Sequence, residues 1–310
     1  MSYPRRLRIV AIGGGTGLAS VLRGLKSLDC DITAIVTVAD DGGSSGRLRK
    51  DMGMLPPGDI RNCLLALAEA EPDMTSLFNH RFARGALAGH NFGNLFLAAM
   101  TEMTGDFQLA VKTMSRILAV KGRVVPATLS DVTLRADMED GSVVLGEYAI
   151  PQVRKRIRKL SLVPPDPPAL DEAVSAIGGA DGIIIGPGSL YTSVIPNLLV
   201  PGIREAIAAS SAKKLYVCNI MTQPGETDGY SVQIMSSPLR STQAAWLHRF
   251  WRTSPRLPRR LRPSMPKKAA FRFDWTWQSW LKEVTRSWRE TICLEAIWPG
   301  TIHPNWPLPS

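Results

Sequence analysis

Two glycine-rich turns, each at the end of a short apolar run, mark residues 1–62 of this chain. The first run, residues 8–12, ends in Gly13, Gly14, Gly15, Thr16 and Gly17, and a helical pattern of leucine and valine follows. The second run, residues 32–38, is followed by Asp40, Asp41 and Gly42. In an open parallel sheet, such strand–turn–helix units place backbone N–H groups at the carboxyl ends of the strands, where they bind anions. We therefore expect a phosphorylated ligand at these turns.

The first turn departs from the two common phosphate-binding patterns. A G-x-G-x-x-G frame that starts at Gly13 puts Leu18 in the third glycine's place, and one that starts at Gly15 puts Ser20 there. No Gly-Lys-Ser/Thr follows, so the turn is not a P-loop. A plain left-handed turn is the alternative interpretation of the glycines. Asp40 and Asp41 suit a ribose hydroxyl or a Mg²⁺ ion with its own phosphate partner, and a solvated turn is the alternative for them.

The charge of the chain is concentrated in its last quarter. Of the formal net charge of +10, residues 1–232 contribute +1 (24 Lys and Arg against 23 Asp and Glu) and residues 233–310 contribute +9 (13 against 4). All 8 tryptophans and only 1 of the 26 glycines lie in that last segment. We predict a nucleotide-binding core over residues 1–232 and an unrelated Trp-, Arg- and Pro-rich tail over residues 233–310.

The remaining composition favours a cytoplasmic protein. The 4 cysteines include no C-x-x-C pair, so neither a zinc site nor a disulfide framework is expected. No apolar run reaches the length of a membrane span, and the N-terminus leads directly into the first strand without a signal peptide.

The order of the elements predicts an α/β fold. Helical patterns recur over residues 60–70, with Asp59 as the N-cap, and over residues 74–82, 94–103 and 107–118. Buried strands are expected at residues 182–185 and 215–218, and a hairpin at residues 132–138 and 143–149. We predict a Rossmann-like, mostly parallel sheet with helices on both faces and a small β-hairpin addition.

Further polar residues follow the predicted strands or begin the predicted helices, where ligand-facing groups belong in such a sheet. Arg61 is a candidate for a two-pronged phosphate contact. A third candidate anion-binding turn contains Gly186, Gly188 and Ser189. The other candidates for polar ligand contacts are Asn62, Asn91, Asn94 and Thr227. Helix capping is the alternative for the asparagines. His80 and His90 have no paired nucleophile nearby in the sequence, so no catalytic residue is assigned.

Together these segments resemble the gluconeogenesis-factor family, CofD-like proteins related to 2-phospho-L-lactate transferase. The resemblance rests on six motifs, at residues 13–17, 39–49, 58–62, 91–95, 186–193 and 221–227. It implies a cytoplasmic regulator that binds a UDP-sugar such as UDP-N-acetylglucosamine. It also implies a role in carbon flow, wall growth and cell shape on gluconeogenic carbon sources. Protein partners in cell-wall metabolism and a homodimer are open interpretations, and no nucleic-acid partner is expected.

Two enzymatic functions are the alternatives. A transferase of the related type would move a phospholactyl-type group from a guanosine diphosphate carrier, with Mg²⁺, onto a deazaflavin alcohol. A regulator would instead leave its sugar nucleotide unchanged, with no certain cofactor. An NAD-dependent oxidoreductase is disfavoured by the incomplete dinucleotide pattern.

The resemblance stops near Val232. In the family, an Asp-His helix and a late Arg-His motif follow, and neither is present in residues 233–310. A shift of the reading frame would change the composition abruptly and remove the family motifs from one point onward, and we favour this interpretation. The loss would also remove part of the expected sugar-nucleotide contact. The alternatives are binding of single-stranded nucleic acid by Arg and Trp, an interfacial helix, and a new protein-binding domain.

Overall fold

The computed structural model describes residues 5–219 and 221–231. The predictions made above for residues 233–310 lie outside the described residues. The strands are β1 (Leu7–Gly13), β2 (Cys30–Val36), β3 (Arg123–Pro126), β4 (Thr133–Met138), β5 (Val143–Leu145), β6 (Ile157–Val163), β7 (Gly182–Ile185) and β8 (Lys213–Tyr216).

Helices connect most of these strands. They are α1 (Gly15–Lys26), α2 (Gly43–Met52), α3 (Gly58–Leu67), α4 (Pro72–Asn79), α5 (Phe92–Thr104), α6 (Phe107–Ile117), α7 (Ala149–Gln152), α8 (Asp171–Gly178), the single π-turn η1 (Leu190–Val194), α9 (Ile195–Leu198) and α10 (Pro201–Ala209). Within the described part of the chain, no helix combines the length and the apolar composition that a membrane span requires.

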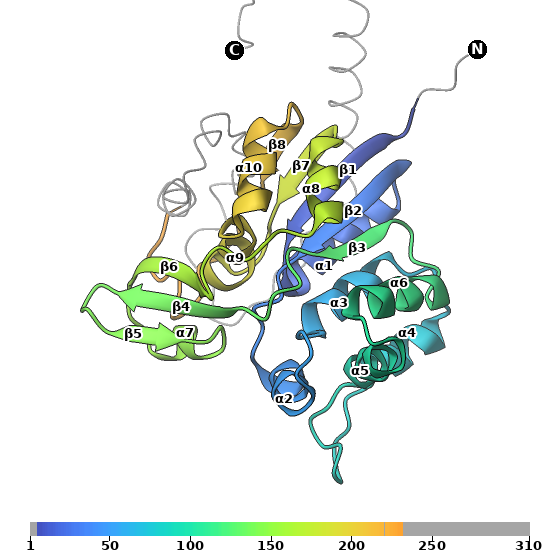
Figure 1. The fold of residues 1–310 in the computed structure, drawn as a ribbon, viewed down its shortest axis with the longest axis horizontal. Coiled ribbons are helices and arrows are strands. Elements are labelled where there is room, and N and C mark those ends of the chain that lie inside the picture. Colours follow the sequence, from blue (N-terminus) through green and yellow to red (C-terminus); the bar gives the residue numbers. More distant parts are fainter. Residues whose placement is uncertain (1–4, 220, 232–310) are drawn as a thin grey trace, which may run out of the picture. The chain divides into compact units, whose positions relative to one another are not determined.

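Five strands form a parallel sheet in the order β3-β2-β1-β7-β8. The chain moves from β1 to β2 toward one edge and from β7 to β8 toward the other (Figure 1). The strand order therefore reverses between β1 and β7, and a crevice at the carboxyl ends of these two strands is the expected ligand site. The predicted α/β class with a mostly parallel sheet is confirmed.

Helices lie on both faces of this sheet. Helix α1 contacts β1, β2 and α3, while α8 contacts α10 and β3 (Figure 1). Right-handed crossovers place α1, which leads to β2, and α10, which leads to β8, on opposite faces. With both faces covered, a central strand can be apolar throughout. Residues 9–12 of β1 are accordingly all 2% exposed or less.

The predicted hairpin belongs to a second, antiparallel sheet. Strands β4 and β5 pair as expected, but β6 joins β4 on its other side to give the order β5-β4-β6. The second hairpin strand is shorter than predicted, because the chain turns after Leu145 and begins α7 at Ala149. Strands β3 and β6 were not predicted; β3 is only 4 residues long, and β6 contains the charged residues Arg158 and Lys159.

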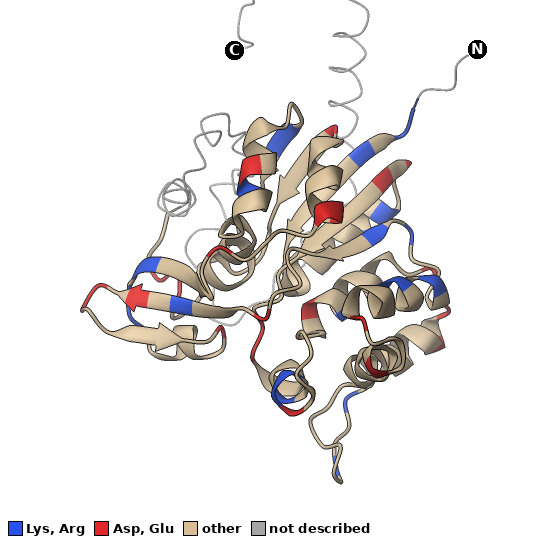
Figure 2. Cartoon of the chain, viewed as in Figure 1, with Lys and Arg blue, Asp and Glu red and all other residues tan. Residues whose placement is uncertain are grey.

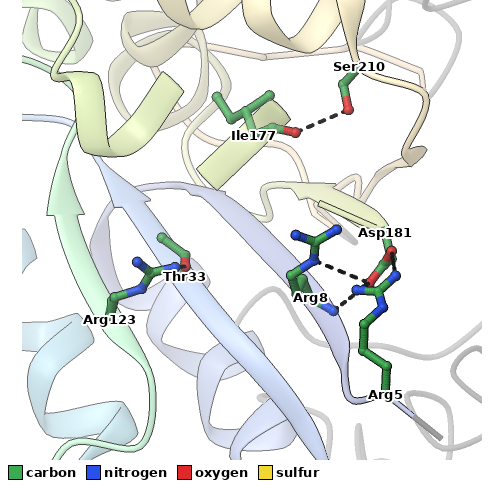
Figure 3. Close-up of polar contacts among 7 residues, drawn as sticks. All are labelled: Arg5, Arg8, Thr33, Arg123, Ile177, Asp181 and Ser210. Carbon is green, nitrogen blue, oxygen red and sulfur yellow. Dashed lines mark hydrogen bonds and ion pairs between the residues drawn. The ribbon is translucent and has the colours of Figure 1, made fainter. Parts of the chain in front are cut away.

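Asp181, which lies between α8 and β7, joins the amino ends of β1 and β7. Asp181 accepts two hydrogen bonds from the Arg5 guanidinium, at 3.0 and 2.8 Å, and one from the Arg8 N–H at 2.8 Å (Figure 3). Partial burial alone would raise the pKa of Asp181, but these hydrogen bonds and the two arginine charges hold it below its ordinary value. This cluster lies at the amino ends of β1 and β7, opposite the end where the strand order predicts a ligand.

Charged residues are distributed over the whole of the described part. Figure 2 shows Lys and Arg interspersed with Asp and Glu along the helices and strands. This distribution agrees with the near-neutral charge of residues 1–232, and it differs from the clustered basic surface that nucleic-acid binding requires.

Candidate functional site

A cavity of about 470 Å³ opens at the carboxyl ends of β1 and β7. This volume lies within the range of about 300–1,000 Å³ that is usual for small-molecule sites. Its lining is polar and, among the residues that the structure describes, contains neither Lys nor Arg. The residues are Gly14, Gly15, Thr16, Gly17, Thr37, Asp40, Asp59, Glu147, Gly188, Ser189, Thr192, Ser193, Asn219 and Gln223. The crevice predicted by the strand order is therefore a real cavity, and residues from both halves of the sheet line it.

The N-terminus of α1 forms the floor of this cavity. Gly14 is extended and precedes the helix, and Gly15 has a φ of +62°, which an L side chain rarely adopts. The N–H groups of the first helical turn have no acceptor within the helix, and the positive end of the helix dipole lies there. A Cβ at Gly17 would lie 2.6 Å from the Pro187 carbonyl oxygen, so the turns after β1 and β7 are in direct contact.

Three carboxyl groups line the cavity. Burial and the Asp40 charge together raise the pKa of Asp59 to about 7, against a hydrogen bond from the Gly15 N–H and the Arg61 charge, which lower it. Burial likewise raises the pKa of Glu147 to about 8, with Asp40 the largest charge contribution. The pKa of Asp40 is also raised by burial, against a 2.9 Å hydrogen bond from the Gly42 N–H. The carboxyls of Asp59 and Glu147 therefore each change protonation state near neutral pH.

Asp59 is not the N-cap of its helix, and this prediction was wrong. Helix α3 begins two residues earlier than predicted, at Gly58, with Pro57 at the N-cap position. Proline is well suited to the start of a helix because its missing N–H would have no intrahelical acceptor. The Asp59 carboxyl is consequently free of the capping role, and it lies in the cavity wall beside Gly14 and Gly15.

The two acidic residues after β2 have different positions. Asp40 lines the cavity, whereas Asp41 is absent from the lining. The Asp41 Oδ1 atom accepts a 2.7 Å hydrogen bond from the Tyr148 N–H. Asp41 thereby attaches the loop between β5 and α7, which carries Glu147, to the edge of the cavity.

Arg61 lies behind the cavity wall in a network of amides. Its guanidinium donates to Asn94 Oδ1 at 2.8 Å and to Asn62 Oδ1 at 2.6 Å, and the residue is only 8% exposed. The Arg61 Nε atom has no hydrogen-bond partner among the described residues. The pKa of Arg61 is lowered to about 10. Burial and the Arg81 charge lower it, and the Asp59 and Asp40 charges oppose part of this effect. Arg61 thus provides the positive charge that faces the cavity carboxyls from within the protein.

Both asparagines near residue 92 stabilise the start of α5. Asn91 is its N-cap, and its side chain accepts from the Asn94 N–H at 3.2 Å. The Asn94 side chain in turn donates to Ser45 Oγ at 3.5 Å. His90 has a serine nearby in space, because His90 Nδ1 lies 3.2 Å from Ser44 Oγ. These two residues are 46 positions apart, so sequence proximity could not reveal the pair.

The turn after β7 is tied to the segment that follows β8. The Gly188 N–H donates to Asn219 Oδ1 at 3.1 Å, and the Asn219 amide donates back to the Gly188 carbonyl at 2.8 Å. The Thr227 hydroxyl accepts a 2.8 Å hydrogen bond from the Gln223 N–H and closes the turn of residues 223–227. Thr227 therefore supports the cavity wall without lining it.

About half of the residues predicted for the site line the cavity. Those that do are Gly14, Gly15, Thr16, Gly17, Asp40, Asp59, Gly188 and Ser189. Those outside the lining are Gly13, Asp41, Gly42, Arg61, Asn62, Asn91, Asn94, Gly186 and Thr227. The lining residues that were not predicted are Thr37, Glu147, Thr192, Ser193, Asn219 and Gln223. Thr37 directly follows β2, and four others lie within about eight residues after β7 or β8, positions that could have identified them, whereas Glu147 carries no local signal.

The family model described as 2-phospho-L-lactate transferase CofD matches residues 9–245. The chain belongs to the CofD family. Residues 246–310 lie beyond the match, and the described residues that line the cavity lie within it.

Relatives of this CofD-family chain carry the name gluconeogenesis factor. It is 62% identical over 226 residues to a putative gluconeogenesis factor of Nostoc sp., an alignment that covers 73% of this chain and 50% of the relative. It is 57% identical over 228 residues to a gluconeogenesis factor of Halalkalibacterium halodurans, covering 73% of this chain and 71% of the relative. The match thus spans half of the Nostoc protein's length. The predicted resemblance to gluconeogenesis factors is confirmed.

A solved structure agrees with the fold. A crystal structure of a UPF0052 family member from Bacillus halodurans superposes with a TM-score of 0.77 at 53% sequence identity, and the match covers 78% of each chain. The Rossmann-like arrangement of the CofD-family chain is therefore shared with an experimentally determined relative.

Proposed function

We propose that this CofD-family chain is a regulator that binds a sugar nucleotide of the UDP-N-acetylglucosamine class and leaves it unchanged. The observation that carries the proposal is the cavity at the switch point of the sheet, where the helix dipole of α1 meets a polar wall. In this function the protein acts in the cytoplasm on carbon flow, wall growth and cell shape. Its relatives' name, gluconeogenesis factor, supports this assignment.

The diphosphate is assigned to the N-terminus of α1. The N–H groups of Thr16 and Gly17 precede the first acceptor within the helix, and an anion at that end interacts favourably with the helix dipole. Asp40, which follows β2, is assigned to a ribose hydroxyl, the role that an acidic residue at this position has in related sheets. Arg61 is assigned to the phosphate charge from behind the wall.

A cation fits beside the diphosphate. The Asp40 charge raises the pKa of Asp59, and the described residues of the lining include no Lys or Arg to neutralise these carboxyls. Mg²⁺ is usually held by one or two carboxylates together with substrate phosphates. Among the described residues, no group of three or more His, Cys, Asp or Glu side chains is placed to hold a metal ion. The residues present thus suit a cation that the ligand's own phosphates help to hold.

The proposal is tested by calorimetric titration of the full chain with UDP-N-acetylglucosamine, UDP, GDP and NAD. We expect one binding site, tighter binding of the uridine nucleotides than of GDP or NAD, and full recovery of the intact sugar nucleotide afterwards. Binding of GDP or NAD alone, or no binding of any nucleotide, would contradict the proposal.

The charge of Glu147 provides a second test at the same site. In the absence of divalent cations, Glu147→Gln should tighten nucleotide binding severalfold at about pH 9, where the carboxyl is ionised. At about pH 6 it should have little effect, because the raised pKa of about 8 already leaves the carboxyl protonated. Glu139→Gln, an exposed change in the same hairpin, is the matched control and should alter binding at neither pH.

A phospholactyl-type transferase is the second candidate. Two observations favour it: the description of the matching family model, and the two carboxyls, Asp59 and Glu147, with pKa values near those of a general base at neutral pH. Mg²⁺ would supply neutralisation of phosphate charge, and one of the two carboxyls, in its ionised form, would accept the proton of the acceptor alcohol. Turnover of a guanosine diphosphate carrier with a deazaflavin alcohol, abolished by Asp59→Asn, would establish this function.

A further inference from the structure

A buried glutamate joins two segments of the cavity wall. Glu226 is 4% exposed and accepts three hydrogen bonds: from the Tyr191 N–H at 3.2 Å, the Thr192 hydroxyl at 3.0 Å and the Gln223 amide at 3.0 Å. Tyr191 and Thr192 belong to η1, which follows β7, and Gln223 lies in the segment after β8. Single π-turns of this kind occur frequently at functional sites. Glu226 itself is absent from the cavity lining, but Thr192 and Gln223 are part of it.

This network fixes the direction of two hydroxyl groups. The Thr192 hydroxyl donates its proton to Glu226 Oε1, because a carboxylate can only accept. The Gln223 amide nitrogen is also held by Glu226, so Gln223 Oε1 is left to accept a proton from the Ser189 hydroxyl at 2.6 Å. Both hydroxyl protons therefore point into the protein. The remaining lone pairs of Ser189 and Thr192 are acceptors for whatever fills the cavity.

The turn after β7 offers few donors in compensation. The Gly186 N–H donates to the Ile12 carbonyl at 2.8 Å, and the Gly188 N–H donates to Asn219 at 3.1 Å. Pro187 between them has no N–H. The negative charge of Glu226 lies directly behind this part of the wall. A phosphate, which only accepts hydrogen bonds, is poorly matched to such a surface, whereas a group rich in O–H or N–H donors is well matched.

We infer that Ser189 and Thr192, oriented by Gln223 and Glu226, recognise the hydroxyl groups of the ligand's sugar ring. The inference rests on the proposed function and assigns one part of the ligand to one part of the cavity. The strand order supports the assignment, because β2, β1 and β7 are neighbours in that order. Asp40 after β2, the N-terminus of α1 after β1, and η1 after β7 then meet ribose, diphosphate and sugar in sequence. Glu226 is a positioning residue in this arrangement.

The test compares UDP-N-acetylglucosamine with UDP in the full chain and in Thr192→Val and Ser189→Ala. Each variant should weaken binding of the sugar nucleotide about tenfold, the effect of one good hydrogen bond, and change UDP binding less than twofold. Thr222→Val, an exposed change in the neighbouring turn, should alter neither. An equal loss for UDP and the sugar nucleotide would overturn the inference and leave the proposed function intact. Failure of the parent chain to bind either ligand would overturn both.

A sugar analogue separates recognition from a structural effect. Replacing one sugar hydroxyl of the ligand by fluorine removes a hydrogen-bond donor and keeps the size nearly unchanged. For the analogue that lacks the recognised hydroxyl, the parent chain and Thr192→Val should bind equally, because the contact is already lost. Glu226→Gln should reduce the preference for the sugar nucleotide over UDP in the same direction. A tenfold effect of Thr192→Val that persists with every fluorinated analogue would overturn the inference.

Discussion

The Tyr148 N–H donates a 2.7 Å hydrogen bond to Asp41 Oδ1, across 107 positions of the chain. Asp41 follows a strand of the parallel sheet, and Tyr148 lies between the small antiparallel sheet and α7. This bond therefore links the two sheets at the edge of the cavity. It also sets the position of Glu147, the neighbour of Tyr148, in the cavity wall.

Loss of this link should release Glu147 from the cavity. We predict that Asp41→Ala costs about 1–2 kcal/mol of stability, as expected for a backbone donor deprived of a charged acceptor. It should also increase amide hydrogen exchange over residues 146–150. Asp51→Ala, an exposed change on α2, is the control and should affect neither measurement. Unchanged exchange in Asp41→Ala would show that the loop is held by other contacts.

The stability of the chain should fall as pH rises through about 7 to 8. The pKa values of Asp59 and Glu147 are raised to about 7 and about 8 from ordinary values of 3.8 and 4.5. The folded state therefore binds more protons than the unfolded state between these limits. Their contribution to stability is complete below the unfolded pKa values and is lost as pH passes through the folded ones.

Thermal unfolding at about pH 6 and about pH 9, without divalent cations, measures this dependence. Asp59→Asn should reduce the difference between the two midpoints, by about 2–4 °C for each kcal/mol of ionisation cost that it removes. A midpoint that is higher at pH 9 than at pH 6 would contradict the assignment of these raised pKa values.

The parts of the site that could be predicted share a common physical origin. Glycines after β1 and polar residues after β2 and β7 are visible in the sequence because the carboxyl ends of neighbouring parallel strands meet at one edge. Glu147 has no such relation to the parallel sheet. It reaches the cavity through the Asp41–Tyr148 bond, a tertiary contact that no local pattern encodes.

The other wrong predictions concern residues at the starts of helices. Asp59 has the composition of an N-cap, but Pro57 and Gly58 start α3 earlier and leave its carboxyl to the cavity. Asn91 does cap its helix, and Asn94 and Arg61 bond to each other rather than to the cavity. Residue type indicated a polar role in each case, whereas the partner depended on packing between α3 and α5.

A side chain at Gly17 should destabilise the chain, because the turns after β1 and β7 are in contact there. A Cβ there would lie 2.6 Å from the Pro187 carbonyl oxygen, and backbone atoms cannot move aside as a flexible side chain can. We predict that Gly17→Ala destabilises the chain by about 1–3 kcal/mol, although alanine favours the helix. Urea unfolding measures the change.

The matched control for this substitution is at the end of α8. A Cβ at Gly178 would meet nothing within 4 Å. Gly178→Ala should therefore leave the stability unchanged or raise it by up to about 1 kcal/mol through helix propensity. Equal effects of the two alanines would show that the turns after β1 and β7 can separate without cost.

Removal of the charge behind the cavity wall should affect both folding and binding. Arg61→Ala removes the hydrogen bonds to Asn62 and Asn94 and the positive charge near Asp40 and Asp59, and we predict a loss of about 1–3 kcal/mol. Nucleotide binding should weaken as well, in this chain and in a relative of full family length. Arg84→Ala, an exposed change, is the control for both measurements. Unchanged nucleotide affinity in a folded Arg61→Ala chain would remove the phosphate role assigned to it.

The tail of residues 233–310 should prove to be a change of reading frame. We predict that resequencing around the codons for residues 225–245, followed by translation in all three frames, restores an Asp-His helix and a late Arg-His motif with a single-base correction. If the frame stands, the Trp- and Arg-rich tail is a genuine sequence. Its binding to single-stranded nucleic acid and to membranes is then the next measurement.

The position of the cavity along the chain has a consequence for such an event. Every residue that lines the described cavity lies between Gly14 and Gln223, before the change of composition near Val232. A change of frame at that point keeps every described residue of this pocket and removes the family's later contacts with the sugar nucleotide. The first three quarters of the gene then specify the described part of the ligand site, and its remainder bears on whether the folded chain persists. A single mutation separates these two properties.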